Sequence, residues 1–218
     1  MSREGLYKMQ ASRLFSFLKQ LFGGQSMPSD LVLIAGLGNP GHEYEGTRHN
    51  IGFEAAYALA DQYGFTPFKN KYGGLWAEGK IDGQKCALLL PLTYMNLSGQ
   101  SVAKAMNFYK IPPAKLIVLH DELDLPFGTV RIKQGGGTAG HNGLKSIDAC
   151  LGNKNYWRVR FGIAHPGGRA SVSGYVLGKF SAQEQDKVVD LLTLFAKHGD
   201  LLIQNKMTDL EQKLKGNG

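Results

Sequence analysis

The sequence predicts an α/β protein, a single layered domain whose mixed, mostly parallel twisted sheet is flanked by helices. Residues 31–35 and 116–119 are continuous apolar runs, which are typical of strands buried on both faces of such a sheet. Segments with the apolar spacing of helices alternate with strand-like segments, as in layered α/β domains. The 218 residues contain no internal repeat and no internal linker long enough to divide this domain.

The first half of the domain contains clear signals for the ends of its elements. Gly64 ends the first helical pattern, and Pro112-Pro113 prevents continuation of the second. Asp82-Gly83 favours a tight turn between two strands and therefore predicts a hairpin. The elements expected here are strands at 31–35, 75–80, 85–90 and 116–119 and helices at 53–63 and 98–109.

The second half continues the alternation. Ser181 and Glu184 have the spacing of a capping box, so a helix is expected to begin there and to run through Leu202. The other elements expected here are strands at 130–133 and 157–163 and helices at 144–151 and 209–214. The main domain therefore covers residues 31–218.

Residues 1–30 differ from the rest and are expected to be an N-terminal extension, either flexible or helical. Apolar residues at helical spacing could form one face of a helix; they are Leu14, Phe15, Phe17, Leu18, Leu21 and Phe22. One interpretation is an organelle-targeting or membrane-surface helix. The favoured interpretation is an extension ahead of the domain, or an upstream start with Met27 as the true initiator.

Composition narrows the classes of function. Lys and Arg total 25 and Asp and Glu total 18, so the net charge is +7, which suits a polyanionic partner. No apolar run approaches the ~18 residues of a membrane span. Cys86 and Cys150 are the only cysteines and form neither a disulfide framework nor a zinc motif, so a cytoplasmic protein is expected.

The segment from Gly36 to Gly41 has the G-x-G-x-x-G pattern of dinucleotide-binding proteins. That pattern binds a pyrophosphate only when a helix starts at the loop. Here ten polar or glycine-punctuated residues follow Pro40 before helical spacing begins, and Asp61 lies inside the helix. We therefore interpret Asn39 as a polar side chain presented at the carboxyl end of a strand, where α/β folds place their sites.

Further polar residues stand beside predicted turns and strand ends. The segments concerned are Thr47-Arg48-His49-Asn50, Met95-Asn96, His120-Asp121 and His141-Asn142. No G-x-S-x-G motif is present, and the spacing of the histidines and Asp121 matches no standard metal motif. A His–carboxylate pair that activates water, with carboxamides to orient a carbonyl group, remains the best interpretation. Neither a metal nor a cofactor is expected.

Five motifs resemble bacterial-type peptidyl-tRNA hydrolases in order and spacing, across roughly residues 31–214. They are Gly36-Leu37-Gly38-Asn39-Pro40-Gly41 with Tyr44, Thr47-Arg48-His49-Asn50, Met95-Asn96-Leu97-Ser98-Gly99, His120-Asp121-Glu122-Leu123-Asp124 and His141-Asn142-Gly143-Leu144-Lys145. The resemblance implies hydrolysis of the ester between a nascent peptide and the tRNA 3′ end. Such activity recycles tRNA from prematurely released peptidyl-tRNA during translation and ribosome rescue.

The resemblance also implies residue roles. His49 resembles the general base that deprotonates water, and Asp121 the carboxylate that orients and stabilises its imidazole. The remaining implied site residues are Asn39, which is catalytic with this pair, and Tyr44, Met95, Asn96, His141 and Asn142, which bind the substrate. Of these, Asn142 is expected to position water and stabilise the oxyanion, whereas Tyr44 and Met95 are expected to form walls of the cleft.

Basic residues alternate with apolar ones on two predicted strands. Arg131 and Lys133 point to one side of their strand, and Arg158 and Arg160 to one side of theirs. The simpler alternative is ordinary surface pairing with Asp or Glu. The resemblance implies a clamp for the tRNA 5′-phosphate and supports Arg131 and Lys133 most; Arg160 is also assigned to tRNA binding.

Two other functions remain open from the sequence. One is a non-catalytic RNA-binding member of the same fold, for which the N-terminal extension leaves room. The other is a nucleotide-binding oxidoreductase. The expected enzyme is a monomer that acts on peptidyl-tRNA without membrane association.

Overall fold

The computed structural model describes residues 29–167 and 171–215. The expected N-terminal extension, residues 1–30, lies almost entirely outside this range. Of the extension, the structure describes only Ser29 and Asp30. Ser29 donates its backbone N–H to the Lys110 carbonyl, 3.1 Å away, and Asp30 pairs with Lys115. No helix among the described residues is long and apolar enough to cross a membrane.

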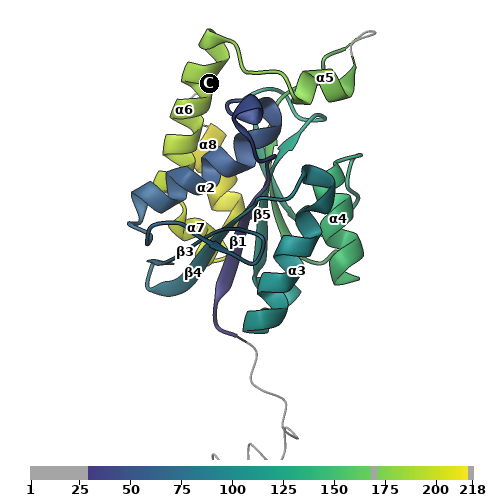
Figure 1. Cartoon of the computed structure of the whole chain (residues 1–218). Helices are drawn as coiled ribbons and strands as arrows, with labels where there is room; N and C mark the ends of the chain where they lie inside the picture. Colours follow the sequence, from purple (N-terminus) through teal and green to yellow (C-terminus); the bar gives the residue numbers. More distant parts are fainter. Residues whose placement is uncertain (1–28, 168–170, 216–218) are drawn as a thin grey trace, which may run out of the picture.

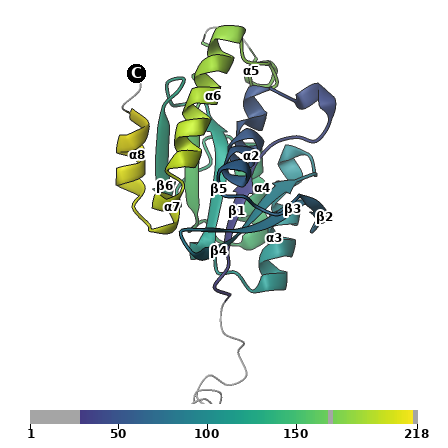
Figure 2. The same cartoon turned by 90° about the vertical axis from the view of Figure 1, so that its left-hand side faces the viewer.

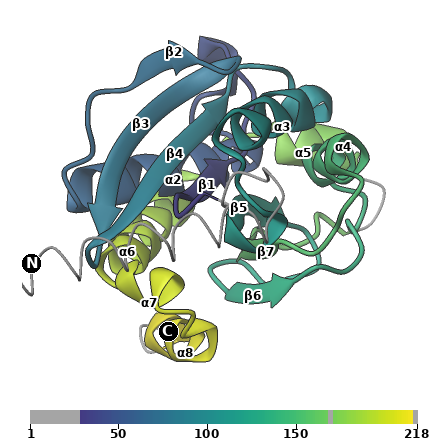
Figure 3. The same ribbon diagram turned by 90° about the horizontal axis from the view of Figure 1, so that it is seen from below.

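One seven-stranded sheet forms the centre of the domain, in the order β2-β3-β4-β1-β5-β7-β6. Its strands are β1 (Val32–Gly36), β2 (Lys69–Lys71), β3 (Gly74–Ile81), β4 (Gln84–Pro91), β5 (Leu116–Glu122), β6 (Val130–Gln134) and β7 (Trp157–Gly162). The pairs β4–β1, β1–β5 and β5–β7 are parallel, and the outer pairs are antiparallel. The predicted mixed sheet is confirmed, and its twist is visible from below (Figure 3).

Helices cover both faces of the sheet (Figure 1). They are α2 (Ile51–Gln62), α3 (Ser98–Tyr109), α4 (Asn142–Leu151), α5 (Val172–Val176), α6 (Ala182–Lys197), α7 (Asp200–Ile203) and α8 (Met207–Lys215). Helices α2 and α6 contribute to one apolar cluster and α3 and α4 to the other, so the sheet is buried on both sides. Helix α8 lies beside the edge strand β6 (Figure 2).

Several local predictions are confirmed. Asp82 and Gly83 both have positive φ, 49° and 77°, as a two-residue hairpin turn between β3 and β4 requires. Ser181 and Glu184 form the expected capping box. Residues 33–35 of β1 and 116–119 of β5 are apolar and buried, as in parallel strands with helices on both faces.

The prediction of one helix from the capping box through Leu202 is wrong. Helix α6 ends at Lys197, and α7 begins separately at Asp200. Gly199 packs so closely on α2 that a Cβ there would lie 2.7 Å from Leu59. This close approach turns the chain between the two helices, whereas the apolar spacing continued unbroken through the turn.

Candidate active site

The carboxyl ends of the central parallel strands border a cleft of about 630 Å³. The loop after β1 contributes Asn39, β5 contributes Asp121, and the short helices η2 (Arg48–Asn50) and η3 (Met95–Leu97) contribute further residues. The cleft is lined by Asn39, His49, Tyr94, Met95, Asn96, Asp121, Glu122, Leu123, Ala139, Gly140, His141, Asn142, Val172, Ser173, Val176 and Leu177. Residues from the five motifs therefore meet at one edge of the sheet.

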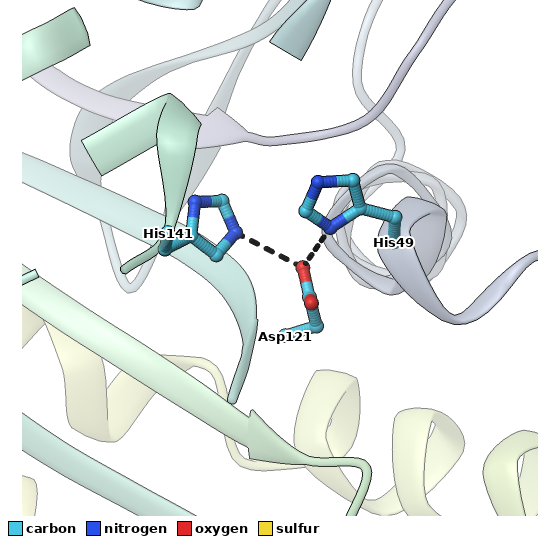
Figure 4. Close-up of side chains that lie close together, drawn as sticks. All are labelled: His49, Asp121 and His141. Carbon is cyan, nitrogen blue, oxygen red and sulfur yellow. Dashed lines mark hydrogen bonds and ion pairs between the residues drawn. The ribbon is translucent and has the colours of Figure 1, made fainter. Parts of the chain in front are cut away.

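Close packing of α2 on the sheet brings His49 to β5. Gly36 and Gly52 face each other, and a Cβ on either would collide with the backbone opposite, so only glycine permits this approach. His49 Nδ1 then lies 2.8 Å from Asp121 Oδ1 (Figure 4). An ionised carboxylate only accepts, so Nδ1 carries the proton and Nε2 has the lone pair. No hydrogen bond to another described residue engages Nε2.

His141 is a second donor to the same carboxylate oxygen. Its Nε2 lies 3.0 Å from Asp121 Oδ1, and its Nδ1 accepts from the N–H groups of Gly143 and Leu144 at 3.1 and 3.4 Å. These amides belong to the first turn of α4, so they fix the tautomer with the proton on Nε2. Both ring nitrogens of His141 therefore have partners within the protein, although the ring borders the cleft.

The Asp121 carboxyl group is 3 % exposed, so the two imidazoles dominate its surroundings. Burial opposes ionisation, but the positive charge that His49 and His141 carry when protonated, together with their hydrogen bonds, outweighs it and holds the pKa of Asp121 far below its ordinary value. The carboxylate is thus an anion at neutral pH. It can stabilise a positive charge that forms on His49.

A third imidazole, His120, is buried beside this pair. Its Nδ1 donates to the Asp121 backbone carbonyl at 2.6 Å, and its ring meets His141 edge-on at 4.9 Å. Burial, followed by the charge of His141, lowers the pKa of His120 well below the ordinary value. His120 is therefore a neutral packing partner of the site and does not supply a second base.

The predicted carboxamides occupy different positions. The Asn39 side-chain oxygen accepts the Met95 N–H at 2.7 Å, which fixes its orientation and leaves the NH₂ group available to a substrate. Asn96 and Asn142 are exposed residues of the cleft lining. Asn50, to which no role was assigned from sequence, holds the Asn39 backbone through two hydrogen bonds of 2.9 and 3.0 Å.

Two predicted cleft walls are placed differently. Met95 is buried and borders the cleft. Tyr44 is half-buried in η1 (His42–Tyr44) and is not among the lining residues. The outer wall instead comes from α5, whose Val172, Ser173 and Val176 line the cleft and were not identified from sequence. Only Ser171, the N-cap of α5, could have indicated this short helix.

The predicted basic faces of β6 and β7 lie on one side of the sheet, with Arg131 opposite Arg160 and Lys133 opposite Arg158. The prediction that Arg158 contributes to a basic surface is wrong. Arg158 is fully buried, where it donates to the Gly137 carbonyl at 2.8 Å and pairs with an aspartate of α4. The alternation on β7 did not reveal this burial, because α4 and the loop before it cover that end of the strand.

Glutamates pair with two of the remaining three cations. Arg160 Nε is 2.9 Å from Glu122, and an Arg131 nitrogen is 4.0 Å from Glu211 on α8. Burial, with the charges of Arg160 and Arg158, lowers the pKa of Lys133. The positive charges of these neighbouring side chains repel one another. Binding of an anion beside them would reduce this repulsion and is therefore favoured.

A metal site is the main alternative for the histidine–aspartate cluster. His49, Asp121 and His141 offer ligand atoms within 4.8 Å of one another. The backbone N–H groups at His141 Nδ1 oppose this alternative, because they require a proton on Nε2, the nitrogen that a metal would have to bind. His141 could bind a metal there only as an imidazolate.

Covalent catalysis by cysteine is also disfavoured. Cys86 is buried as predicted, and burial raises the pKa of its thiol to about 11.

The loop after β1 does not have the form of a dinucleotide-binding loop. It leads into η1 and then η2, and the first α-helix after it begins only at Ile51, so it lacks the helix start that binds a dinucleotide. Fold and site together define an α/β enzyme with a His–carboxylate pair in its cleft.

Comparisons with known proteins identify the family. The family described as peptidyl-tRNA hydrolase matches residues 33–217, and the chain belongs to this family of enzymes. A peptidyl-tRNA hydrolase of Rhodospirillum centenum is 52% identical over 171 residues, 78% of this chain and 75% of the relative. One from Granulibacter bethesdensis is 50% identical over 188 residues, 86% and 96% of the two chains.

A solved structure shows the same fold. The crystal structure of peptidyl-tRNA hydrolase from Acinetobacter baumannii has a TM-score of 0.80 and 44% sequence identity, with coverage of 88% of this chain and 97% of that chain. The sequence-based assignment to this family is therefore confirmed, and so are the fold class and the enzymatic character. The oxidoreductase alternative is wrong.

Proposed function

We propose that the cleft hydrolyses the ester of peptidyl-tRNA by general-base attack of water, without a metal. The observation that carries this proposal is the 2.8 Å contact between His49 Nδ1 and Asp121, which leaves Nε2 as the free ring nitrogen of a cleft-lining residue. His49 takes a proton from water as the oxygen attacks the carbonyl carbon. The bond to the tRNA 3′ oxygen then breaks, and that oxygen receives the proton.

Carboxamides assist the reaction in this proposal. The NH₂ group of Asn39 and the side chain of Asn96 bind the peptide and its carbonyl group, and Met95 forms part of the wall. Asn142 positions water and donates to the developing oxyanion. His141 contacts the substrate only through its ring edge, because both nitrogens are engaged. Tyr44 lies outside the cleft lining, so it would contact only a substrate that extends beyond the cleft.

Arg131, Lys133 and Arg160 are proposed to bind the 5′-phosphate at the tRNA acceptor stem. Glu211 and Glu122 hold the side chains of Arg131 and Arg160 in place, and a dianionic phosphate would displace these carboxylates or share the guanidinium groups with them. The physiological role proposed is recycling of tRNA during translation by a cytoplasmic monomer. Residues 1–30 remain a proposed extension that does not take part in the chemistry.

Chelation should leave the reaction unaffected. Because His141 Nε2 carries a proton in the observed network, the cluster presents no complete set of free ligand nitrogens. We expect the same kcat and KM on N-acetyl-aminoacyl-tRNA before and after dialysis against EDTA. Loss of activity that only zinc restores would refute the metal-free mechanism.

The double change Arg131→Ala, Lys133→Ala should raise KM about tenfold or more, since charge-assisted hydrogen bonds contribute roughly 1.5–3 kcal/mol each. The kcat should change little, because these residues position the tRNA away from the ester. Lys69→Ala, Lys71→Ala is the matched control, since it removes the same charge from the exposed edge strand β2.

Removing the 5′-phosphate of the tRNA should raise KM by a similar factor for the unaltered protein. This loss and the loss caused by the double change should not add, because both remove the same contact. Full additivity of the two losses would show that the pair binds elsewhere on the RNA or serves only as surface.

A further inference from the structure

Arg48, the residue before the proposed base, extends away from the cleft chemistry to the segment that follows β7. One guanidinium nitrogen donates to the carbonyls of Gly178 and Lys179 at 3.3 and 2.8 Å. The other is bonded to both carboxylate oxygens of Glu184 at 3.1 and 2.9 Å. The Arg48 side chain is only 11 % exposed, so these contacts are largely shielded from water.

Aromatic rings complete the surroundings of this guanidinium. Its central carbon lies 4.4 Å from the centre of the Tyr175 ring and 5.2 Å from that of Phe180. A planar guanidinium can lie against rings while its two terminal nitrogens bind different partners, here two carbonyls and a carboxylate, whereas a lysine has one nitrogen and no planar group. The site therefore uses the properties that distinguish arginine from lysine.

The backbone joins the same two segments. Arg48 N–H donates to the Gly178 carbonyl at 3.0 Å, and Phe180 N–H donates to Gly46 at 3.3 Å. Thr47 and Lys179 form an antiparallel bridge. The turn that carries His49 and the segment after α5 are thus held together side by side.

Helix α5 has few other attachments among the described residues. Val172, Ser173 and Val176 line the cleft, and Tyr175 donates its hydroxyl to the Ile163 carbonyl at 2.6 Å. Val176 is the only buried residue of this five-residue helix. Because α5 buries so little apolar surface, its position depends on the polar contacts at its carboxyl end.

Glu184 connects Arg48 to the start of α6. One of its oxygens accepts the Ser181 N–H at 2.8 Å, and both bind Arg48. Burial opposes ionisation, but the Ser181 N–H and hydroxyl groups and then Arg48 outweigh it and lower the pKa of Glu184. The ion pair is therefore formed at neutral pH and fixes both ends of the segment from α5 to α6.

We propose that Arg48 is a positioning residue that holds the α5 wall of the cleft against the turn bearing His49. It sets the width of the cleft on this side and so determines how well the substrate is bound. The residue does not touch the reacting atoms. This inference deepens the proposed function, since it assumes that peptidyl-tRNA occupies the cleft beside His49.

Arg48→Lys tests the proposal because it keeps the charge but loses the planar group and the second terminal nitrogen, so the carbonyls and Glu184 can no longer be bound by separate nitrogens. We expect KM for N-acetyl-aminoacyl-tRNA to rise about fivefold or more, while kcat falls by less than about threefold because the His49–Asp121 contact remains. The backbone amides of Leu177, Gly178 and Phe180 should exchange hydrogen about tenfold faster or more, and those of β5 should not change.

Two further variants complete the experiment. Glu184→Gln keeps an acceptor for the Ser181 N–H but removes the charge, so it should give the same pattern with smaller changes and serves if Arg48→Lys fails to fold. Lys115→Gln is the control, because it removes the ion pair between Asp30 and the last residue of η4 (Pro113–Lys115), directly before the amino end of β5. It should change neither KM nor amide exchange.

Unchanged KM and unchanged exchange at Leu177, Gly178 and Phe180 in both Arg48→Lys and Glu184→Gln would overturn the proposal. A fivefold or larger loss of kcat in Arg48→Lys with an unaltered KM would also overturn the proposal, because that result would place Arg48 in the chemical step. Amide exchange is measured without substrate. It therefore still tests the attachment of α5 if His49 proves not to be the base.

Discussion

Replacing His49 by alanine is expected to lower kcat by ~10²–10⁴-fold, the usual contribution of a general base. His49 is the cleft imidazole whose second ring nitrogen has no partner among the described residues. His141 has both ring nitrogens engaged, and His120 is fully buried with a lowered pKa. His141 cannot replace His49 without breaking its own hydrogen bonds, and His120 is buried and does not line the cleft.

The His49→Ala protein should remain folded, because Asp121 keeps its hydrogen bond to His141. Circular dichroism and the KM for peptidyl-tRNA check that fold and binding are preserved. His42→Ala is the matched control, since His42 is a highly exposed histidine of the neighbouring η1 and should leave kcat unchanged. Retention of more than about a tenth of the activity would show that His49 is not the base.

Asp121→Asn should also lower kcat strongly, by ~10²–10⁴-fold. The amide has nearly the same shape but no charge, so it cannot stabilise the imidazolium that forms on His49. If its NH₂ group faces His49, it also reverses the tautomer; the comparable change in a Ser–His–Asp triad lowers kcat about 10⁴-fold. Single-turnover hydrolysis of N-acetyl-aminoacyl-tRNA measures this loss directly.

The control for Asp121→Asn is Asp186→Asn, the same chemical change at an exposed position of α6. It should leave the rate unaltered. Thermal unfolding of Asp121→Asn must be measured as well, since the position is buried. A variant that unfolds normally and hydrolyses at the rate of the unaltered protein would refute the role of the carboxylate.

Local sequence signals predicted most of the fold because they act over a few residues. The Asp82-Gly83 turn, the Ser181 capping box and the apolar strands each follow from the residue types within that segment. Strand β2 was missed because its three residues, Lys69–Lys71, are polar and exposed, and pairing with β3 alone defines it. The break between α6 and α7 was missed because it depends on contact with α2.

The candidate site was predictable where polar residues follow strand ends or precede helices. Asn39, His49 and Asp121 are such residues, and the fold brings them into one cleft. The burial of Arg158 was not predictable from alternation, since α4 and the loop before it cover only one end of β7. The role of Arg48 also depends on residues about 130 positions away.

Rescue of His49→Ala by imidazole is the most direct test of general-base catalysis in this cleft. Imidazole can occupy the space left by the side chain and accept a proton from water. Under single-turnover conditions, the rate of ester cleavage by the variant should rise with imidazole concentration and saturate, while the Asp121→Asn protein should not respond. A rate for His49→Ala that already matches the unaltered protein, or one that imidazole does not raise although tRNA binds normally, would contradict the mechanism.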